Sequence, residues 1–230
     1  MIHQDSTLVT IFRQIDEIPL PRQVGKQAKG HPKSYSDRLI LKGLVFMVIR
    51  HIRNIHEFHS MLRQPTPELD EIRLQLSEEN QFPSRRTWER RIQPIIDAMP
   101  EIIGSLGRYL VTIINPWERS GSAVAIDSTI LRARGGQWHQ KHRKEGIVPH
   151  TSIDQEAHWT KSGWHGWVYG WKLHLICTVG EGWIPLVAIL TPANVDDGAA
   201  APELLRQLPL DVHFVLGDRH YNTETLRGLC

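Results

Sequence analysis

Two aspartates, Asp127 and Asp218, each come at the end of a short apolar run typical of a buried strand. The run "SAVAIDST" is predicted to end as a strand at the first, and "VHFVLGD" ends at the second. Functional groups in open α/β sheets gather beyond the carboxyl ends of strands, so the two carboxylates converge if their strands are neighbours. Two such anions repel unless one is protonated or a cation joins them, and carboxylate oxygens suit hard cations such as Mg²⁺ or Mn²⁺. Strand-end aspartates also cap turns, and the pattern alone leaves both interpretations open.

A group of cations follows the first aspartate in "RARGGQWHQKHRK". Cations beside metal-binding carboxylates suit a phosphodiester substrate, because phosphate contacts supply affinity for nucleic acid. Tryptophans are interleaved with these cations and could stack on unpaired bases. A solvated basic loop with tryptophans packed against the domain fits the same composition. The cations are Arg132, Arg134, Lys141, Arg143 and Lys144, and the tryptophans are Trp138, Trp159, Trp164 and Trp167.

A second basic group lies nearer the amino terminus, in "FPSRRTWERRIQPII". Ser84 is a good N-cap for a helix there, with Trp88 and three isoleucines on one stripe. Arg86 and Arg90 share another face, and Arg85 and Arg91 lie beside them. The helix could enter a groove of DNA, or it could belong to a helical bundle and carry a hydrated basic face.

The elements that must position these residues change in type near residue 120. Residues 1–119 are predicted to be mostly helical, with a polar loop at 21–35 and helices from Ser36, from Ser84 and over about 100–114. After that, strands are predicted at 122–127, 169–180, 183–192 and 212–218. A helix is predicted over 196–208, where Asp196 or Asp197 can cap it, and another begins in "NTETLRGLC". This order, with a long excursion over about 132–169, predicts a mixed α/β domain.

Composition limits the partners. The 230 residues carry a net charge of only +2, so affinity for nucleic acid must come from local patches. Two cysteines cannot build a disulfide framework or a four-cysteine zinc site. The sequence has no P-loop, no dinucleotide fingerprint and no G-x-S-x-G motif. We see no signal peptide and no apolar stretch of membrane-spanning length, and we therefore expect a cytoplasmic protein.

Four stretches of the sequence resemble the bacterial insertion-sequence transposases of the DDE type. They are "AIDSTILRARGGQWHQ", "GWVYGWKLHLI", "IPLVAILTPANVDD" and "VLGDRHYNTETLRGLC", and the resemblance covers about residues 122–230. The helical stretches "SYSDRLILKGL" and "FPSRRTWERRI" are similar to the region that precedes the catalytic domain in those enzymes.

The resemblance implies an α/β ribonuclease-H-like mixed-sheet domain at 120–230, preceded by an all-α, DNA-binding region at 1–119. It implies that Asp127 and Asp218 are the first two catalytic carboxylates and hold Mg²⁺ or Mn²⁺. The activity implied is metal-dependent DNA strand cleavage and strand transfer on double-stranded DNA, at element ends and target, with a homodimer on DNA and a nucleoid-associated location. The DNA-binding residues would be Arg132, Arg134, Lys141, Arg143 and Lys144, together with Arg85, Arg86 and Arg90.

The third carboxylate of the family, a glutamate on a later helix, has no counterpart in these residues. Glu224 follows Asp218 by only 224 − 218 = 6 residues. The sequence is therefore expected to be a C-terminally truncated, catalytically incomplete copy. An alternative is a non-catalytic DNA-binding fragment that interferes with an intact transposase. Asp197 is interpreted as a helix cap or as a residue that supports the site from outside it.

Overall fold

In a computed structural model the chain forms two compact units, residues 1–102 and 103–230, which are described in turn. The structure describes residues 4–20, 35–64, 66–114, 122–180, 182–209, 211–221 and 223–228. The predicted loop falls almost entirely at 21–34, outside these ranges. The predicted domain boundary at 119/120 also lies outside them and stays a prediction. Within the described residues no helix is long and apolar enough to cross a membrane.

The first unit is helical, as the sequence predicts. Ser36 and Ser84 each accept a hydrogen bond from a backbone N–H in the first turn of the helix that follows, which confirms both as N-caps. Trp88 is fully buried and packs edge-on against Phe58. The helices are α1 (Gln4–Glu17), α2 (Asp37–Ile49), α3 (Ile55–Met61), α4 (Pro67–Gln75), α5 (Arg85–Asp97) and the first turn of α6 (Met99–Ile114).

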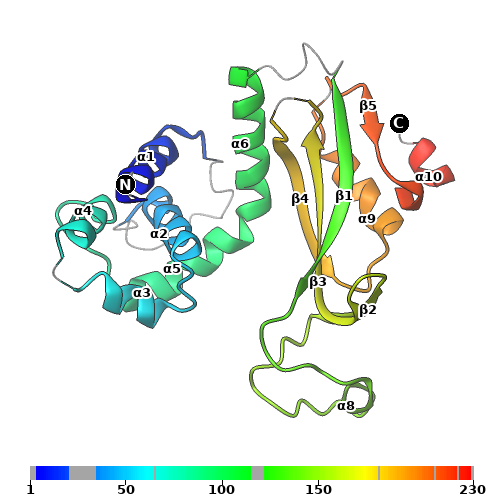
Figure 1. The fold of residues 1–230 in the computed structure, drawn as a ribbon, viewed down its shortest axis with the longest axis horizontal. Helices are drawn as coiled ribbons and strands as arrows, with labels where there is room; N and C mark the ends of the chain where they lie inside the picture. The colour runs from blue at the N-terminus through cyan, green and yellow to red at the C-terminus, as the bar shows by residue number, and fades with distance from the viewer. Residues whose placement is uncertain are drawn as a thin grey trace, which may run out of the picture. The chain divides into compact units, whose positions relative to one another are not determined.

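The second unit is built on a mixed five-stranded sheet (Figure 1). The central strand β3 (Gly166–Thr178) pairs antiparallel with β1 (Ala123–Arg132) on one edge. On its other edge it pairs first with β2 (His158–Ser162) and then with β4 (Pro185–Pro192). The short strand β5 (Phe214–Leu216) runs parallel to β1. The remaining elements are α8 (Gln140–Lys144), α9 (Asp197–Arg206), the 3-10 turn η1 (Arg219–Tyr221) and α10 (Glu224–Arg227).

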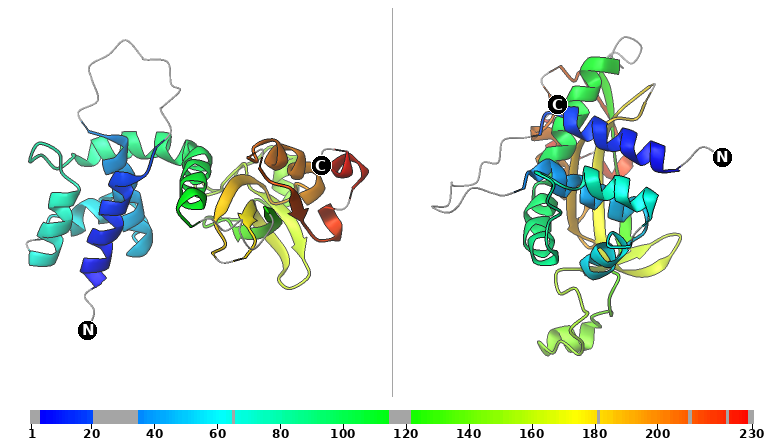
Figure 2. Two further views of the ribbon diagram at one scale, coloured as in Figure 1. Left: turned by 90° about the horizontal axis from the view of Figure 1, so that it is seen from above. Right: turned by 90° about the vertical axis from the view of Figure 1, so that its left-hand side faces the viewer.

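One face of this sheet carries the core. Alternate residues of the strands point to the same face, and Val124, Ile126 and Ile176 pack against Ala201 and Leu204 of α9. We call this the α9 face. The residues between them, such as Ala125, Leu173 and Leu175, point to the other side, which we call the open face. Figure 2 shows α9 on one side of the sheet and the β2–β3 hairpin projecting from the other.

The four predicted strands are all present in the predicted order, with two corrections. The first strand does not end at Asp127, because its pairing with β3 continues to Arg132. The excursion over 132–169 contains a further strand, β2, which was not predicted from the sequence. It forms because residues 158–162 fold back onto the first five residues of β3. The hairpin of β3 and β4 and the helix α9 lie where they were predicted, and the side chain of Asp196 caps α9.

The helix α6 reaches the sheet through glycines. A Cβ atom placed on Gly107 would lie 2.0 Å from the backbone oxygen of Pro185, at the start of β4. Only a residue without a side chain allows the helix to approach the strand this closely.

We predict that Gly107→Ala destabilises the chain by about 1–3 kcal/mol because of this clash, although alanine favours a helix over glycine by roughly 1 kcal/mol. Gly163→Ala is the matched control, because a Cβ there meets nothing within 4 Å. Chemical denaturation with both variants measures the difference. A neutral or stabilising Gly107→Ala would contradict the close packing.

Candidate active site

Asp127 lies within β1, on the open face. It pairs with Leu175 of β3, and its side chain is exposed. A shallow pocket of about 240 Å³ adjoins it and is lined mainly by residues of the open face, including Leu173, Leu175 and Trp183. The backbone N–H of Ser128 donates to the Asp127 carboxylate over 2.7 Å, which fixes one of its oxygens. The other oxygen is available to a ligand from solution.

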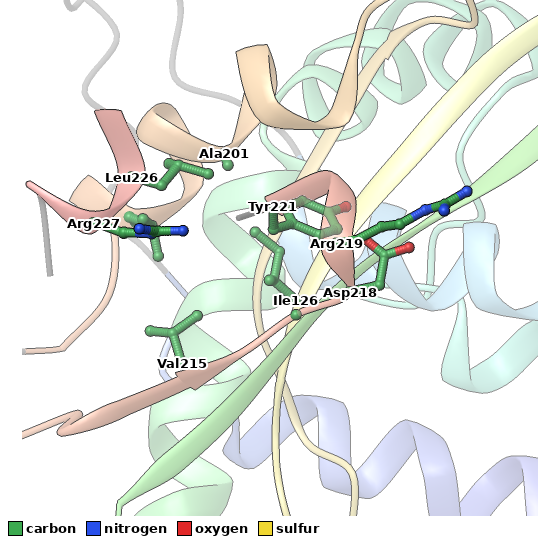
Figure 3. Close-up of a pocket in the computed structure, with 10 residues that line it drawn as sticks. Ile126, Ala201, Val215, Asp218, Arg219, Tyr221, Leu226 and Arg227 are labelled. Carbon is green, nitrogen blue, oxygen red and sulfur yellow. The ribbon is translucent and has the colours of Figure 1, made fainter. Parts of the chain in front are cut away.

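Asp218 follows β5 and lies at the level of Asp127. The parallel register pairs Ala125 with Leu216, and two residues further along each strand come 125 + 2 = 127 and 216 + 2 = 218. Figure 3 shows Asp218 and Arg219 just beyond the end of β5, with Ile126 of β1 beside them. The Asp218 carboxylate accepts a hydrogen bond from the backbone N–H of His220 over 2.8 Å, so it also caps η1. The turn-cap interpretation therefore applies to Asp218, and its role as a metal ligand stays a prediction.

The phenol of Tyr221 has a raised pKa because of its burial and its acidic neighbours. Burial, the charge of Asp197 and, to a smaller extent, the charges of Asp127 and Asp218 raise the pKa of its phenol, while the Ser128 hydroxyl lowers it. The phenol therefore stays protonated. Its side chain is buried at the edge of a pocket of about 400 Å³ that Asp218 and Arg227 also line (Figure 3).

Asp197 joins three elements beneath the aspartate pair. It is the first residue of α9, and its Oδ1 atom accepts a hydrogen bond from the Ser128 hydroxyl of β1 over 2.8 Å. The same oxygen lies 3.1 Å from Nζ of Lys172 in β3, and Lys172 also donates to the backbone oxygen of Val195 over 2.8 Å. Lys172 is 12 % exposed, so its charge needs this partner. Asp197 thus holds β1, β3 and the start of α9 in one arrangement.

His174 completes the group on the α9 face. It pairs with Ser128 across the strands and is fully buried. Its Nε2 lies 2.9 Å from the hydroxyl of Thr191, and its Nδ1 lies 3.6 Å from Asp197. Burial lowers the pKa of His174, the Lys172 charge lowers it further, and Asp197 opposes both.

Lys172 and His174 were not expected from the sequence to have a role in the site. Their spacing in "KLH" could have indicated a shared site, because residues two apart in a strand have their side chains on the same face. Their partner Asp197 was interpreted as a cap or a supporting group. The cap is Asp196, whose carboxylate accepts from the N–H of Gly198 over 2.9 Å, and Asp197 takes the supporting place.

The predicted DNA-binding cations of the excursion differ in their surroundings. Arg143 packs into the excursion: its guanidinium lies 4.9 Å from the ring centre of Trp138 and donates to the backbone oxygen of Ala157 over 3.0 Å. The other four, Arg132, Arg134, Lys141 and Lys144, are exposed. Four cations are therefore accessible to a ligand, whereas Arg143 contacts other residues of the excursion.

The arginines of α5 divide in the same way. Arg91 is buried and binds the Asp37 carboxylate over 2.5 Å and the backbone oxygen of Tyr35 over 2.9 Å. Arg85, Arg86 and Arg90 are exposed, and Arg85 forms an ion pair with Glu89 over 3.2 Å. The helix has a packed face and a hydrated basic face, as the more conservative interpretation of the sequence expects, and that basic face is open to a partner.

The donor set at the carboxylate pair suits a hard cation, because it consists of exposed carboxylate oxygens. Within the described ranges, however, no three His, Cys, Asp or Glu side chains come close enough to hold a metal ion together. Asp197 has its Oδ1 engaged by Ser128 and Lys172 on the α9 face.

We predict that burial of His174 makes the free energy of unfolding depend on pH. Its pKa is lowered in the folded chain, so the unfolded chain takes up a proton as the pH falls through about 6.5 and the folded chain does not. The free energy of unfolding should therefore fall between about pH 7 and 5, by at most about 1.4 kcal/mol per pH unit from this group. His174→Gln should flatten that dependence, and His150→Gln, at an exposed position, should not. Urea denaturation at several pH values measures both; equal slopes for the two variants would refute the role of His174.

The second unit is similar to a known protein family. Residues 118–230 match the family model described as the transposase DDE domain. Searches of curated proteins and of solved structures found no match. The matched residues include the whole mixed sheet and both aspartates, and the sheet has the ribonuclease-H-like arrangement that the sequence resemblance implies. Residues 118–230 of this chain are therefore a DDE transposase domain.

Proposed function

We propose that this chain is an insertion-sequence transposase that binds element-end DNA and acts by metal-dependent strand cleavage and strand transfer. The observation that carries the proposal is the position of Asp127 and Asp218. Asp127 lies in β1, and Asp218 lies at the same level, two residues beyond the end of the parallel neighbour β5. Both lie inside the residues that match the transposase DDE domain. Both carboxylates are exposed, so each is accessible to a cation and to a phosphodiester.

The two carboxylates would hold Mg²⁺ or Mn²⁺. When bound, such ions supply an activated oxygen nucleophile and stabilise the leaving oxygen of an in-line displacement at phosphorus. The chain's own contribution is to place the ligands. The Ser128 N–H orients the Asp127 carboxylate, and the His220 N–H orients that of Asp218. Tyr221 keeps its proton and so adds no further negative charge beside them.

Asp197 would act as a positioning residue for this site. It binds the hydroxyl of Ser128, whose backbone N–H holds Asp127. Lys172 neutralises Asp197, so this third carboxylate does not repel the pair. The arrangement keeps the segment around Asp127 fixed from the α9 face while leaving the open face free for substrate.

Double-stranded DNA is the proposed partner, and the exposed cations of the excursion and of α5 are its proposed contacts. Phosphate contacts of this kind provide affinity without sequence preference. A homodimer on DNA would bring two such sets of contacts to the two element ends.

We predict that Asp127→Asn and Asp218→Asn each weaken Mn²⁺ binding at least about tenfold, because each removes one charged ligand. Asp211→Asn, an exposed aspartate of the same unit, is the control and should bind Mn²⁺ as the unmodified chain does. The paramagnetic resonance signal of free Mn²⁺ measures binding without any need for catalysis. Unchanged binding in both site variants would remove the metal site.

Cleavage is tested separately, by nicking of circular DNA that carries the element ends in the presence of Mg²⁺ or Mn²⁺. Nicking that is lost in Asp127→Asn supports the transposase reaction, whereas nicking that persists in this variant contradicts it. Specific binding of element ends without nicking would instead favour the second candidate, a DNA-binding chain that interferes with an intact transposase. The observation behind that candidate is the pair, rather than a triad, of carboxylates among the described residues.

We predict that Lys141→Ala and Lys144→Ala each lower DNA affinity and reduce the slope of log K against log salt by about one. Arg143→Ala should instead lower the thermal stability of the chain, because it removes the contacts with Trp138 and Ala157. Fluorescence anisotropy across a salt series and thermal denaturation distinguish the two effects. A lysine variant with an unchanged salt slope would not be a phosphate contact.

A further inference from the structure

The four tryptophans of the excursion and hairpin fall into two pairs. Trp138 and Trp159 are engaged within the fold: the Trp159 indole donates to the backbone oxygen of Trp138 over 2.8 Å, and the Trp138 indole donates to that of Ile147 over 2.8 Å. Trp164 and Trp167 lie at the tip of the β2–β3 hairpin and are 95 % and 63 % exposed. Most of the area of these two large apolar side chains is therefore left uncovered by the rest of the protein.

The hairpin that carries them is held firmly. The rings of Trp159 and Tyr169 lie 5.4 Å apart across β2 and β3, and Tyr169 is buried. The indole of Trp171 donates to the Asp154 carboxylate over 2.8 Å, which ties β3 to the excursion. At the tip, the backbone N–H groups of Trp164 and His165 both donate to the Ser162 hydroxyl over 3.3 Å. The exposed rings therefore sit on a preformed support, which lowers the entropic cost of binding.

Charge at the tip favours an anionic partner. Lys161 lies directly opposite Trp167 across the strands, on the same face of the hairpin. From Arg132 to Tyr169 the sequence holds six lysines and arginines against three acidic residues, a balance of 6 − 3 = +3. Exposed aromatic rings beside cations are the combination that binds nucleobases and their phosphates.

The hairpin tip and Asp127 share one face of the sheet. Trp167, Leu173 and Leu175 alternate along β3, and Leu175 pairs with Asp127. The separation along the strand is 175 − 167 = 8 residues, which corresponds to about 26 Å at roughly 3.3 Å per residue. Nucleotides of duplex DNA repeat every 3.4 Å or so, and the distance therefore spans about eight nucleotides.

From these observations we propose that Trp164 and Trp167 form a nucleobase-stacking site that receives an unpaired base of the bound DNA, about eight nucleotides from the phosphodiester at Asp127. The inference rests on the proposed function, since it adds a site to the same DNA path. The hairpin tip would thus bind a base, whereas the cations of the excursion would bind phosphates of DNA of any base sequence.

The test compares three labelled probes of equal length: a paired duplex, the same duplex with one unpaired base, and a single strand. Fluorescence anisotropy measures their binding to the full 230-residue chain at constant salt. The unmodified chain should prefer the probe with the unpaired base, and Trp164→Ala should weaken that complex by about 5- to 150-fold, the range expected for stacking of one base on an aromatic ring. Binding of the paired duplex should change by less than about twofold, because phosphate contacts remain.

Two further variants separate stacking from a general apolar contact. Trp164→Phe keeps an aromatic ring and should retain most of the preference, whereas Trp164→Leu keeps apolar surface only and should lose it. Thermal denaturation should be unchanged in all three variants, because Trp164 makes little contact with the fold.

Several outcomes would overturn the inference. They are equal affinity of the unmodified chain for paired and unpaired probes, an unchanged preference in Trp164→Ala, and an equal loss on all probes. A Trp164-dependent shift in fluorescence with phosphatidylglycerol vesicles, without an effect on DNA, would identify a membrane contact instead. If the paired duplex binds without a preference for the unpaired base, only this inference fails; if no DNA binds, the proposed function fails as well.

Discussion

The two-residue alternation of side chains along β1 is the constraint on which the rest of the second unit depends. It directs Val124, Ile126 and Ser128 to the α9 face and Asp127 to the open face. The apolar core and the exposed carboxylate are therefore consecutive in sequence and separated by the thickness of the sheet. A shift of the pairing register by one residue would bury the carboxylate in the core and expose the isoleucine. Register and site cannot vary independently.

A single carboxylate, Asp197, links that strand to its surroundings. Its contacts with Ser128 and Lys172 join the first strand, the central strand and the helix that covers them, although the sequence separates these elements by up to 69 residues. Buried ionic contacts contribute less to net stability than apolar packing, because each charge loses its water. These contacts instead fix the position of α9 on the sheet. Ser128 and Lys172 both contact the same oxygen of Asp197, and only one placement of the helix allows both contacts.

The sequence predicted the parts of this structure that follow from local pattern. Apolar runs located the strands, and serines before helical patterns located both caps. The end of the first strand was misplaced because Asp127, Ser128 and Thr129 are three consecutive polar residues, a pattern typical of a turn. Pairing with β3 keeps these residues in the strand. The strand β2 was missed because its pairing depends on β3, which no local pattern reveals. The ends of two apolar runs drew attention to Asp127 and Asp218, and the resemblance implies their catalytic role, which stays a prediction. The contacts of Asp197 could be found only from the fold.

The open face has a thermodynamic consequence. Several large apolar side chains on this face are exposed, and the alternation of the strands places them on the side away from α9. They include Leu131, Leu190, Phe214 and Leu216. Apolar area of this kind favours any surface that covers it. A molecule or segment that binds there in the folded state alone raises the free energy of unfolding in proportion to the logarithm of its concentration. The free energy of unfolding of this domain therefore depends on what is bound to the open face of its sheet.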